Sequence, residues 1–267
     1  MKINLWDENF SFTLDKLGYI TASDTLRPSR IEWLYKQKRH PITVFTDLYL
    51  NTPVVDQIMS EIKIAWLVEP KSIFPFTYED IIENEHKFDY IFTHDEDLLN
   101  RSDKYKLLIM GQSRIEDKDA QIYPKTKTVS MIASHKMITE GHKLRHQVKG
   151  DIDRYGHDYI NFDSKLDPLK DYMFSICIMN SRVNNFFTEV LTDPIRTGAI
   201  PIFWGCPNIG NFFDKRGIIE FSTLDELYTI LPTLTKEKYR SMLPFAYKNL
   251  LMSNNYVSTE DSLFRYL

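Results

Sequence analysis

The feature that most constrains the fold of this chain is the alternation of short apolar runs with helical patterns. Each run has the length of one buried strand and ends in polar residues, at 42–50, 62–70, 88–95, 106–111 and 128–136. The intervening segments favour helices near 28–38, at 53–61 and at 77–86. Regular alternation of strand and helix predicts parallel sheets built from βαβ units.

The alternation is interrupted once, at the polar segment 115–127. It then resumes with strands expected near 154–156 and at 174–180, 199–205 and 217–221, a helix at 223–232 and a helical tail from Lys236. We therefore expect two Rossmann-like domains, at 1–125 and 126–250. A C-terminal helix at 251–267 is expected to pack back on the first domain.

Composition and missing motifs exclude several classes of protein. A net charge of -4 and dispersed basic residues argue against nucleic-acid binding. No apolar run approaches the ~18 residues that span a bilayer, and no secretory signal opens the chain, so we expect a cytoplasmic protein without a membrane span. Cys177 and Cys206 have no CxxC spacing. The P-loop, the GxSxG elbow and the GxGxxG fingerprint are all absent.

Parallel sheets bind ligands beyond the carboxyl ends of their strands. This rule singles out the residues that follow the expected strands, namely Glu69, His94, Gly111, Ser134 to Lys136, Asn180 and Gly205.

The stretch 179–205, MNSRVNNFFTEVLTDPIRTGAIPIFWG, follows one such strand. Thr188 and Glu189 begin a helix that Gly198 can end. Glu189 is either a partner of the helix dipole or an acceptor for the hydroxyls of a ribose. The phenylalanines at 186 and 187 either stack on a base or fill the core.

A second group of candidates lies on an amphipathic helix that begins near Thr139. His142 and Arg145 share one face of it, with Lys143 and His146 beside them. A guanidinium at the start of a helix suits a phosphate group, and the alternative is a solvated basic face. No carboxylate accompanies the histidines in a metal-binding pattern, so we expect no metal.

Glu69, in WLVEPKS, leaves a strand just before a proline. A partly desolvated carboxylate there can act as a general base. The alternative is an ordinary turn carboxylate that pairs with Lys71.

The run FSICIMNSRVNNFFTEVLTDPIRTGAIPIFWGCPNI (174–209) resembles the signature of the family 10 glycosyltransferases, the α1,3-fucosyltransferases. TVSMIASHK with the following arginine helix is similar to the family's diphosphate-binding segment. IAWLVEPKSI followed by FDYIFTHDEDL looks like its N-terminal strand with the catalytic glutamate.

The resemblance implies a GT-B fold, in which two facing Rossmann-like domains with parallel sheets hold the donor mainly on the second. It implies inverting, metal-independent transfer of a sugar, usually from GDP-fucose, to a hydroxyl of a glycan acceptor. Glu69 would be the base and Arg145 would bind the diphosphate. The other donor-side residues would be Ser134, His142, Lys143, Asn180, Phe186, Thr188 and Glu189.

Three positions depart from the family pattern. Val190 replaces a lysine, Met179 a glutamate and Phe186 a tyrosine. Lys143 or His142 could supply the missing positive charge. The departures keep two alternatives open: another donor, such as a UDP-sugar, or a non-catalytic module that binds nucleotide or sugar.

Overall fold

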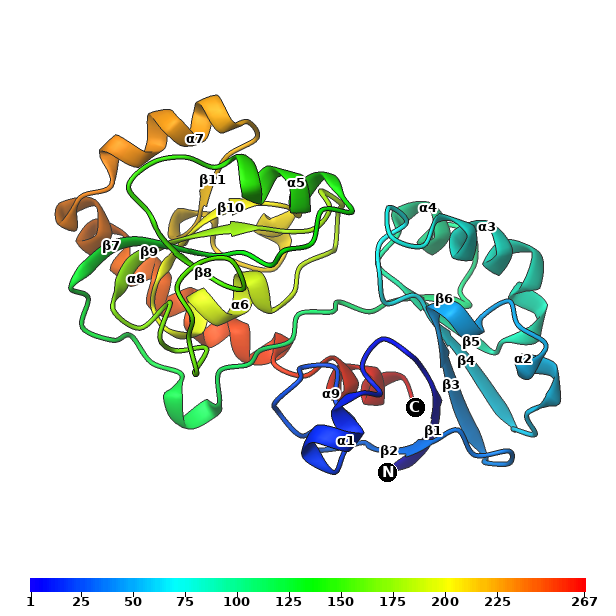
Figure 1. Cartoon of the computed structure of the whole chain (residues 1–267). Helices are drawn as coiled ribbons and strands as arrows, with labels where there is room; N and C mark the ends of the chain where they lie inside the picture. Colours follow the sequence, from blue (N-terminus) through cyan, green and yellow to red (C-terminus); the bar gives the residue numbers. More distant parts are fainter. The chain divides into compact units, whose positions relative to one another are not determined.

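The structure, a computed structural model, describes all 267 residues. The chain divides into two compact units, and each has its own parallel sheet (Figure 1). Unit 1 contains Met1–Met110 together with two later segments, Asn184–Phe186 and Ser258–Leu267. Unit 2 contains Gly111–Val183 and Phe187–Val257.

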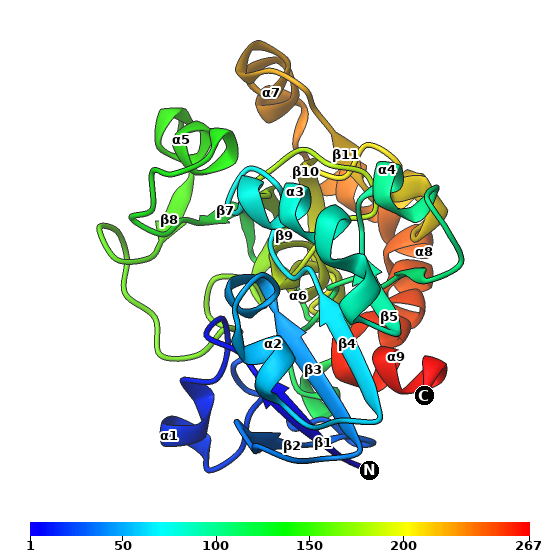
Figure 2. The ribbon, with the colours of Figure 1, turned by 90° about the vertical axis from the view of Figure 1, so that its right-hand side faces the viewer.

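Unit 1 is built on a six-stranded sheet in the order β2-β1-β3-β4-β5-β6, with every neighbouring pair parallel. Its strands are β1 (Lys2–Trp6), β2 (Glu32–Tyr35), β3 (Ile42–Thr46), β4 (Ile62–Trp66), β5 (Tyr90–Thr93) and β6 (Tyr105–Leu107). Its helices are α1 (Thr13–Leu17), α2 (Val54–Gln57), α3 (Pro75–Asn84), α4 (Glu96–Leu99) and α9 (Thr259–Leu263). Helices α2 and α3 cover one face of the sheet and α9 lies on the other (Figures 1 and 2).

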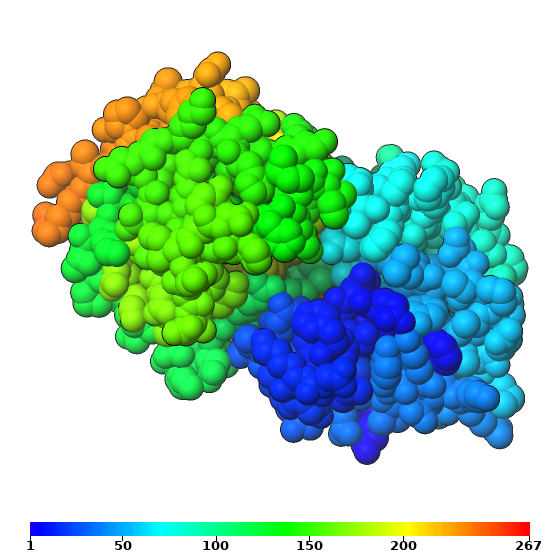
Figure 3. Space-filling model, in the orientation of Figure 1, coloured from blue at the N-terminus to red at the C-terminus, as the bar shows by residue number.

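Unit 2 is built on a five-stranded parallel sheet in the order β11-β10-β9-β7-β8. Its strands are β7 (Lys127–Ile132), β8 (Asp153–Tyr155), β9 (Tyr172–Ile178), β10 (Ile200–Trp204) and β11 (Ile219–Glu220). Its helices are α5 (Glu140–Gln147), α6 (Glu189–Arg196), α7 (Leu224–Ile230) and α8 (Lys236–Ser253). The green segment that carries β7, α5 and β8 covers the face of unit 2 shown in Figure 3.

Burial explains why the central strands of unit 2 were recognisable as apolar runs. Every residue of β9 and β10 is buried, as is usual where helices cover both faces of a parallel sheet. The core that they form includes Phe174, Ile202 and Leu227. The expected alternation of strands and helices in parallel sheets is confirmed.

One expectation about the start of the chain is corrected, and one strand there was not expected. Residues 28–38 contain the strand β2 and not a helix, and Lys2–Trp6 forms the strand β1 that the sequence did not reveal. The two strands pair with each other in parallel, from Lys2 opposite Glu32 to Leu5 opposite Tyr35. This pairing joins residues thirty positions apart, so local pattern alone does not show it.

The units meet in sequence at Met110 and Gly111, whereas the sequence analysis placed the boundary at 125. The segment after Gly111 belongs to unit 2 because it is bonded to α6. The Ser113 hydroxyl donates to the Asp193 carboxylate at 2.8 Å, and the Arg196 guanidinium pairs with Asp117 at 2.6 Å. These bonds, and not the polar composition of 115–127, decide where the segment lies.

The chain returns to unit 1 at Ser258, after the second boundary expected at 250. The Glu260 side chain is fully buried there and accepts a hydrogen bond from the Ala22 N–H at 2.7 Å. Asp261 accepts bonds from Ser29 and Arg30. Among all the helices, none is both long enough and apolar enough to cross a membrane.

Candidate functional site

The candidate site of unit 2 lies at the carboxyl ends of β7 and β9. Strand β7 lies between β8 and β9, so the connections that follow β7 and β9 leave the sheet at a topological switch point. Ligands of doubly wound sheets bind in the crevice at such a point. Ser134 and Asn180, both half-buried, each lie two residues beyond the end of one of these strands.

Helix α5 lies against the end of β9 and fixes Arg145 there. The Gly141 N–H donates to the Asn180 carbonyl at 3.1 Å, and a Cβ on Gly141 would lie 1.8 Å from the Met179 carbonyl oxygen. Arg145, only 9% exposed, donates from Nε and Nη2 to the Ile178 carbonyl at 2.8 and 2.5 Å. The sequence-predicted Arg145 and Asn180 therefore lie at the same strand end.

His142 has a structural role at the start of α5. Thr139 caps the helix by accepting the His142 N–H, and the Thr139 hydroxyl lies 2.9 Å from Nδ1 of the His142 ring. Burial, with the Arg145 charge second, lowers the pKa of His142 to about 4. His142 is therefore uncharged at neutral pH and does not supply the missing positive charge. Lys143 is exposed on the same helix.

Glu189 begins α6 as one partner of an ion pair. Thr188 caps the helix by accepting the Val190 N–H at 3.4 Å. Glu189 Oε1 lies 3.0 Å from Arg114 Nη1, and their side chains are 18% and 21% exposed. Burial raises the pKa of Glu189, but the Arg114 guanidinium and the Thr188 hydroxyl outweigh it and leave the pKa below its usual range. The ionised carboxylate has acceptor sites beyond the one used by Arg114.

The two phenylalanines of the loop between β9 and α6 are core residues. Phe186 is 2% exposed and packs in unit 1 on the His94 ring, with 4.7 Å between ring centroids. Phe187 is fully buried in unit 2 against Phe212 and Phe213. Phe186 therefore offers no free ring face for a base, and its expected stacking role is corrected: apolar burial determines its position.

The Met179 departure also has a packing reason. Met179 is 1% exposed, and a Cβ on Gly205 would lie 2.4 Å from its Cγ. Gly205, just after β10, thus packs closely against the apolar side chain of Met179, just after β9. An ionised glutamate at this buried position would need a partner that the apolar neighbours do not supply.

Glu69 lies in unit 1, just beyond the end of β4. Its N–H donates to Asp47 Oδ2 at 3.1 Å, and its carbonyl accepts the Tyr78 hydroxyl at 2.8 Å. Its side chain is half-buried. The backbone of the predicted base is thus held on both sides of its Cα.

Two residues that contact predicted site residues were missed by the sequence analysis. Asp47 is fully buried just after the carboxyl end of β3, where its position as the first charged residue after a strand-like run was the available signal. Arg114 pairs with Glu189 across 75 positions of sequence, and no local pattern predicts that contact.

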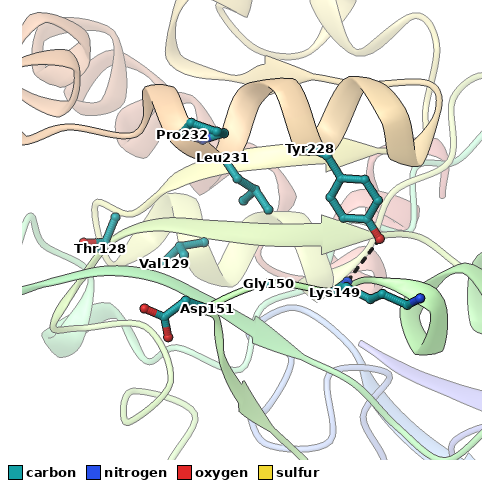
Figure 4. A pocket seen from close by; sticks show the side chains of 8 residues that line it. All are labelled: Thr128, Val129, Lys149, Gly150, Asp151, Tyr228, Leu231 and Pro232. Carbon is teal, nitrogen blue, oxygen red and sulfur yellow. Dashed lines mark hydrogen bonds between the residues drawn. The ribbon is translucent and has the colours of Figure 1, made fainter.

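One cavity of unit 2 is separate from these residues. It has a volume of about 570 Å³ and lies between the first half of β7 and α7 (Figure 4). The Tyr228 hydroxyl at its edge accepts the Lys149 N–H at 3.2 Å. None of the sequence-predicted site residues lines it.

Comparison with known proteins identifies the family. The model for "Glycosyltransferase family 10 (fucosyltransferase) C-term" matches residues 122–263, which is more than half of the chain. A putative fucosyltransferase-like protein of Arabidopsis thaliana is 30% identical over 104 residues, 38% of this chain and 20% of that protein. An α-(1,3)-fucosyltransferase of Helicobacter pylori is 28% identical over 94 residues, 34% of this chain and 20% of that enzyme. The matched part thus spans about a fifth of these relatives.

Solved structures show the fold at low sequence identity. An α1,3-fucosyltransferase crystallised with GDP superposes with a TM-score of 0.59 at 16% identity, covering 100% of this chain and 88% of that one. An α-glucosyltransferase in complex with UDP and DNA gives a TM-score of 0.58 at 9% identity, covering 99% and 97%. Together with the two parallel-sheet units, these neighbours confirm the predicted GT-B fold class. The chain belongs to glycosyltransferase family 10, the fucosyltransferase family.

Proposed function

We propose that this protein transfers fucose or a similar sugar from a nucleoside diphosphate donor, GDP-linked, to a hydroxyl of a glycan acceptor, with inversion and without a metal ion. Membership of family 10 gives the reaction class. The observation that carries the proposal is the position of Arg145, which lies in the last turn of α5 and is fixed on the Ile178 carbonyl at the end of β9.

Unit 2 would bind the donor. A guanidinium and the free N–H groups of helix N-termini are the groups that best stabilise a leaving diphosphate, because negative charge develops on it as the glycosidic bond breaks. Arg145 would contact the diphosphate, with Ser134, Asn180 and Lys143 beside it. Glu189 would accept the ribose hydroxyls with the carboxylate sites that Arg114 leaves open, and Thr188 would keep α6 capped.

Glu69 would act as the general base. It would accept the proton of the acceptor hydroxyl while that oxygen attacks the anomeric carbon from the face opposite the diphosphate. One displacement of this kind inverts the anomeric configuration. The bond from carbon to the acceptor oxygen forms as the bond to the diphosphate breaks.

Glu69→Gln tests the base, because it keeps the size of the side chain and removes its basicity. We expect turnover to fall by about 10²–10⁴-fold with GDP affinity unchanged. Glu83→Gln, at an exposed position of α3, is the control. A rate of Glu69→Gln within a few-fold of wild type would refute the role of Glu69.

The identity of the donor has one specific rival. Val190 stands where the family pattern has a lysine, and some structural neighbours were solved with UDP or UDP-glucose. A thermal-shift panel of GDP, UDP, GDP-fucose and UDP-glucose separates the two donors, because a ligand at 100 times its Kd adds ~2.7 kcal/mol of stability. Stabilisation by UDP alone would overturn the GDP assignment. Binding without turnover for any donor would favour a non-catalytic module.

Three further properties are parts of the same proposal. Metal independence predicts equal rates with and without EDTA, and inversion predicts a product of opposite anomeric configuration by NMR. The net charge of -4 favours a glycan over nucleic acid as acceptor. A cytoplasmic location is supported by Cys177 and Cys206, which are buried and form no disulfide.

A further inference from the structure

Unit 1 has a buried polar cluster at its own topological switch point. Strand β1 lies between β2 and β3, and Asp7 and Asp47 follow the carboxyl ends of β1 and β3. Both side chains are 0% exposed, and Thr46 between them is 1% exposed. The Thr46 hydroxyl donates to Asp7 Oδ1 at 2.6 Å. Buried carboxyl groups are rare unless they are paired or bonded, so their contacts indicate what they do.

Asp7 and Asp47 are bonded to different parts of the backbone. Asp7 accepts the N–H groups of residues 9 to 11 and so orders its own loop. Asp47 accepts the Val68 N–H at 2.8 Å and the Glu69 N–H at 3.1 Å. It also accepts the Asn9 amide at 3.0 Å. Asp47 therefore bonds the backbone of the proposed base, twenty-two residues away in sequence.

The bonds to Asp47 continue the hydrogen bonding of the chain beyond the last backbone bond between β4 and its neighbour β5. The Leu67 N–H still bonds to the Phe92 carbonyl of the neighbouring strand at 2.9 Å. The next two N–H groups, of Val68 and Glu69, bond to the Asp47 carboxylate. The direction in which the chain leaves β4 is thus set by Asp47, the residue that follows β3. That direction determines where the Glu69 carboxylate lies.

We propose that Asp47 is a positioning residue that holds Glu69 in the place where it can accept the acceptor proton. The inference rests on the proposed function of Glu69. Tyr78 completes the arrangement, because its hydroxyl bonds to the Glu69 carbonyl. Three donors meet the Asp47 carboxylate, so neither oxygen is left without a partner.

Charge links the same residues. Burial raises the pKa of Asp47 to about 8, and the nearby Glu69 carboxylate adds to the rise against the lowering effect of its N–H donors. The other titratable groups of this cluster are Asp7 and Tyr78, and burial raises the pKa of each.

Asp47→Asn is the test. The amide oxygen of asparagine can still accept the Val68 N–H, but its NH₂ group would face the N–H of Glu69 and the amide of Asn9. We expect kcat to fall by 10-fold or more, while the KM for the donor and the affinity for GDP change less than twofold.

A double variant separates positioning from general stability. In Asn9→Asp/Asp47→Asn the carboxylate at position 9 can accept the new amide, which restores that contact but not the acceptor for the Glu69 N–H. We expect Tm to recover and kcat to stay low. Recovery of kcat together with Tm would mean that Asp47 acts only through stability and would overturn the proposal.

Asp89→Asn is the matched control. Asp89 accepts the Lys63 N–H at 2.8 Å, a bond of the same kind at the opposite end of β4, and kcat should not change. Assaying Glu69→Gln in parallel distinguishes the role of Glu69 from that of Asp47. If Glu69→Gln keeps its activity, Glu69 is not the base. If Glu69→Gln loses activity and Asp47→Asn keeps it, Asp47 is not a positioning residue. If neither Asp47 variant folds, amide exchange on the unmodified protein decides, because rapid exchange of both the Val68 and Glu69 protons would overturn the proposal.

Discussion

Gly141→Ala is expected to destabilise unit 2 although the substitution favours helix formation. Gly141 is the second residue of α5, where replacement of glycine by alanine gains at most ~1 kcal/mol. A Cβ there would lie 1.8 Å from the Met179 carbonyl oxygen and 2.8 Å from that of Asn180. Because both atoms belong to the backbone at the end of β9, no side-chain rotation relieves the clash.

The magnitude follows from the movement that the clash demands. Carbon and oxygen must separate by roughly 1 Å or more, which moves the first turn of α5 off the strand. Overpacking of this kind costs about 1–3 kcal/mol, and the bond from Gly141 to Asn180 is worth about 1 kcal/mol. The net loss is about 2 kcal/mol, or a fall in Tm of about 4–8 °C.

The same movement carries Arg145 away from the Ile178 carbonyl, so GDP affinity should fall by about tenfold, equivalent to about 1.4 kcal/mol. Calorimetric scanning and titration measure the two effects. Gln147→Ala, exposed at the end of the same helix, should leave both unchanged. A Gly141→Ala protein as stable as wild type, with unchanged GDP affinity, would refute the close approach of α5 to β9.

Three further predictions concern single side chains. Phe186→Ala should lower the free energy of unfolding in denaturant by about 3–5 kcal/mol and leave GDP affinity unchanged, because the ring is buried in the core. Loss of GDP affinity with unchanged stability would restore the stacking role. His142→Gln keeps the capping pair with Thr139 and removes a group whose pKa is about 4 when folded and ~6.5 unfolded. Between these values the unfolded chain binds more protons than the folded one, so the free energy of unfolding of the wild type should fall by up to about 3 kcal/mol as pH falls from 6.5 to 4. The variant should lose less, and an equal loss of unfolding free energy in both proteins would argue against this. Arg114→Met removes the ion-pair partner of the Glu189 carboxylate, so it should lower the free energy of unfolding by about 1–3 kcal/mol at pH 7 and by less at pH 4.5. An equal decrease at both pH values would contradict the pairing.

Local pattern predicted the parts of the fold whose signal is local. The runs that became β3, β4, β9 and β10 are apolar along their length because both faces of the sheet are covered. Strand β2, with a half-buried pattern over Glu32–Tyr35, exists through its partner β1 and was read as helix. The sequence order of a doubly wound fold also placed Glu69, Arg145, Asn180 and Glu189 at strand and helix ends.

What the sequence did not predict depends on contacts between distant positions. Arg114 meets Glu189, and Asp47 meets the backbone of Glu69, through the fold alone. Phe186 has the sequence setting of an exposed loop aromatic, yet it packs in unit 1 against His94. The charge of His142 is set by its burial and by Arg145, and a count of basic residues does not show that it is neutral.

The segment Ser258–Leu267 has a consequence for the order of folding during synthesis. Parts of unit 1 are made before and after unit 2, so the Ala22 N–H finds its acceptor only when Glu260 has been made. N-terminal domains generally fold first during translation, but here unit 2 can be complete while unit 1 still lacks a buried carboxyl and the helix that carries it. Unit 1 is therefore completed after unit 2, so a stop codon before Ser258 would leave the earlier-made part of unit 1 without its last segment.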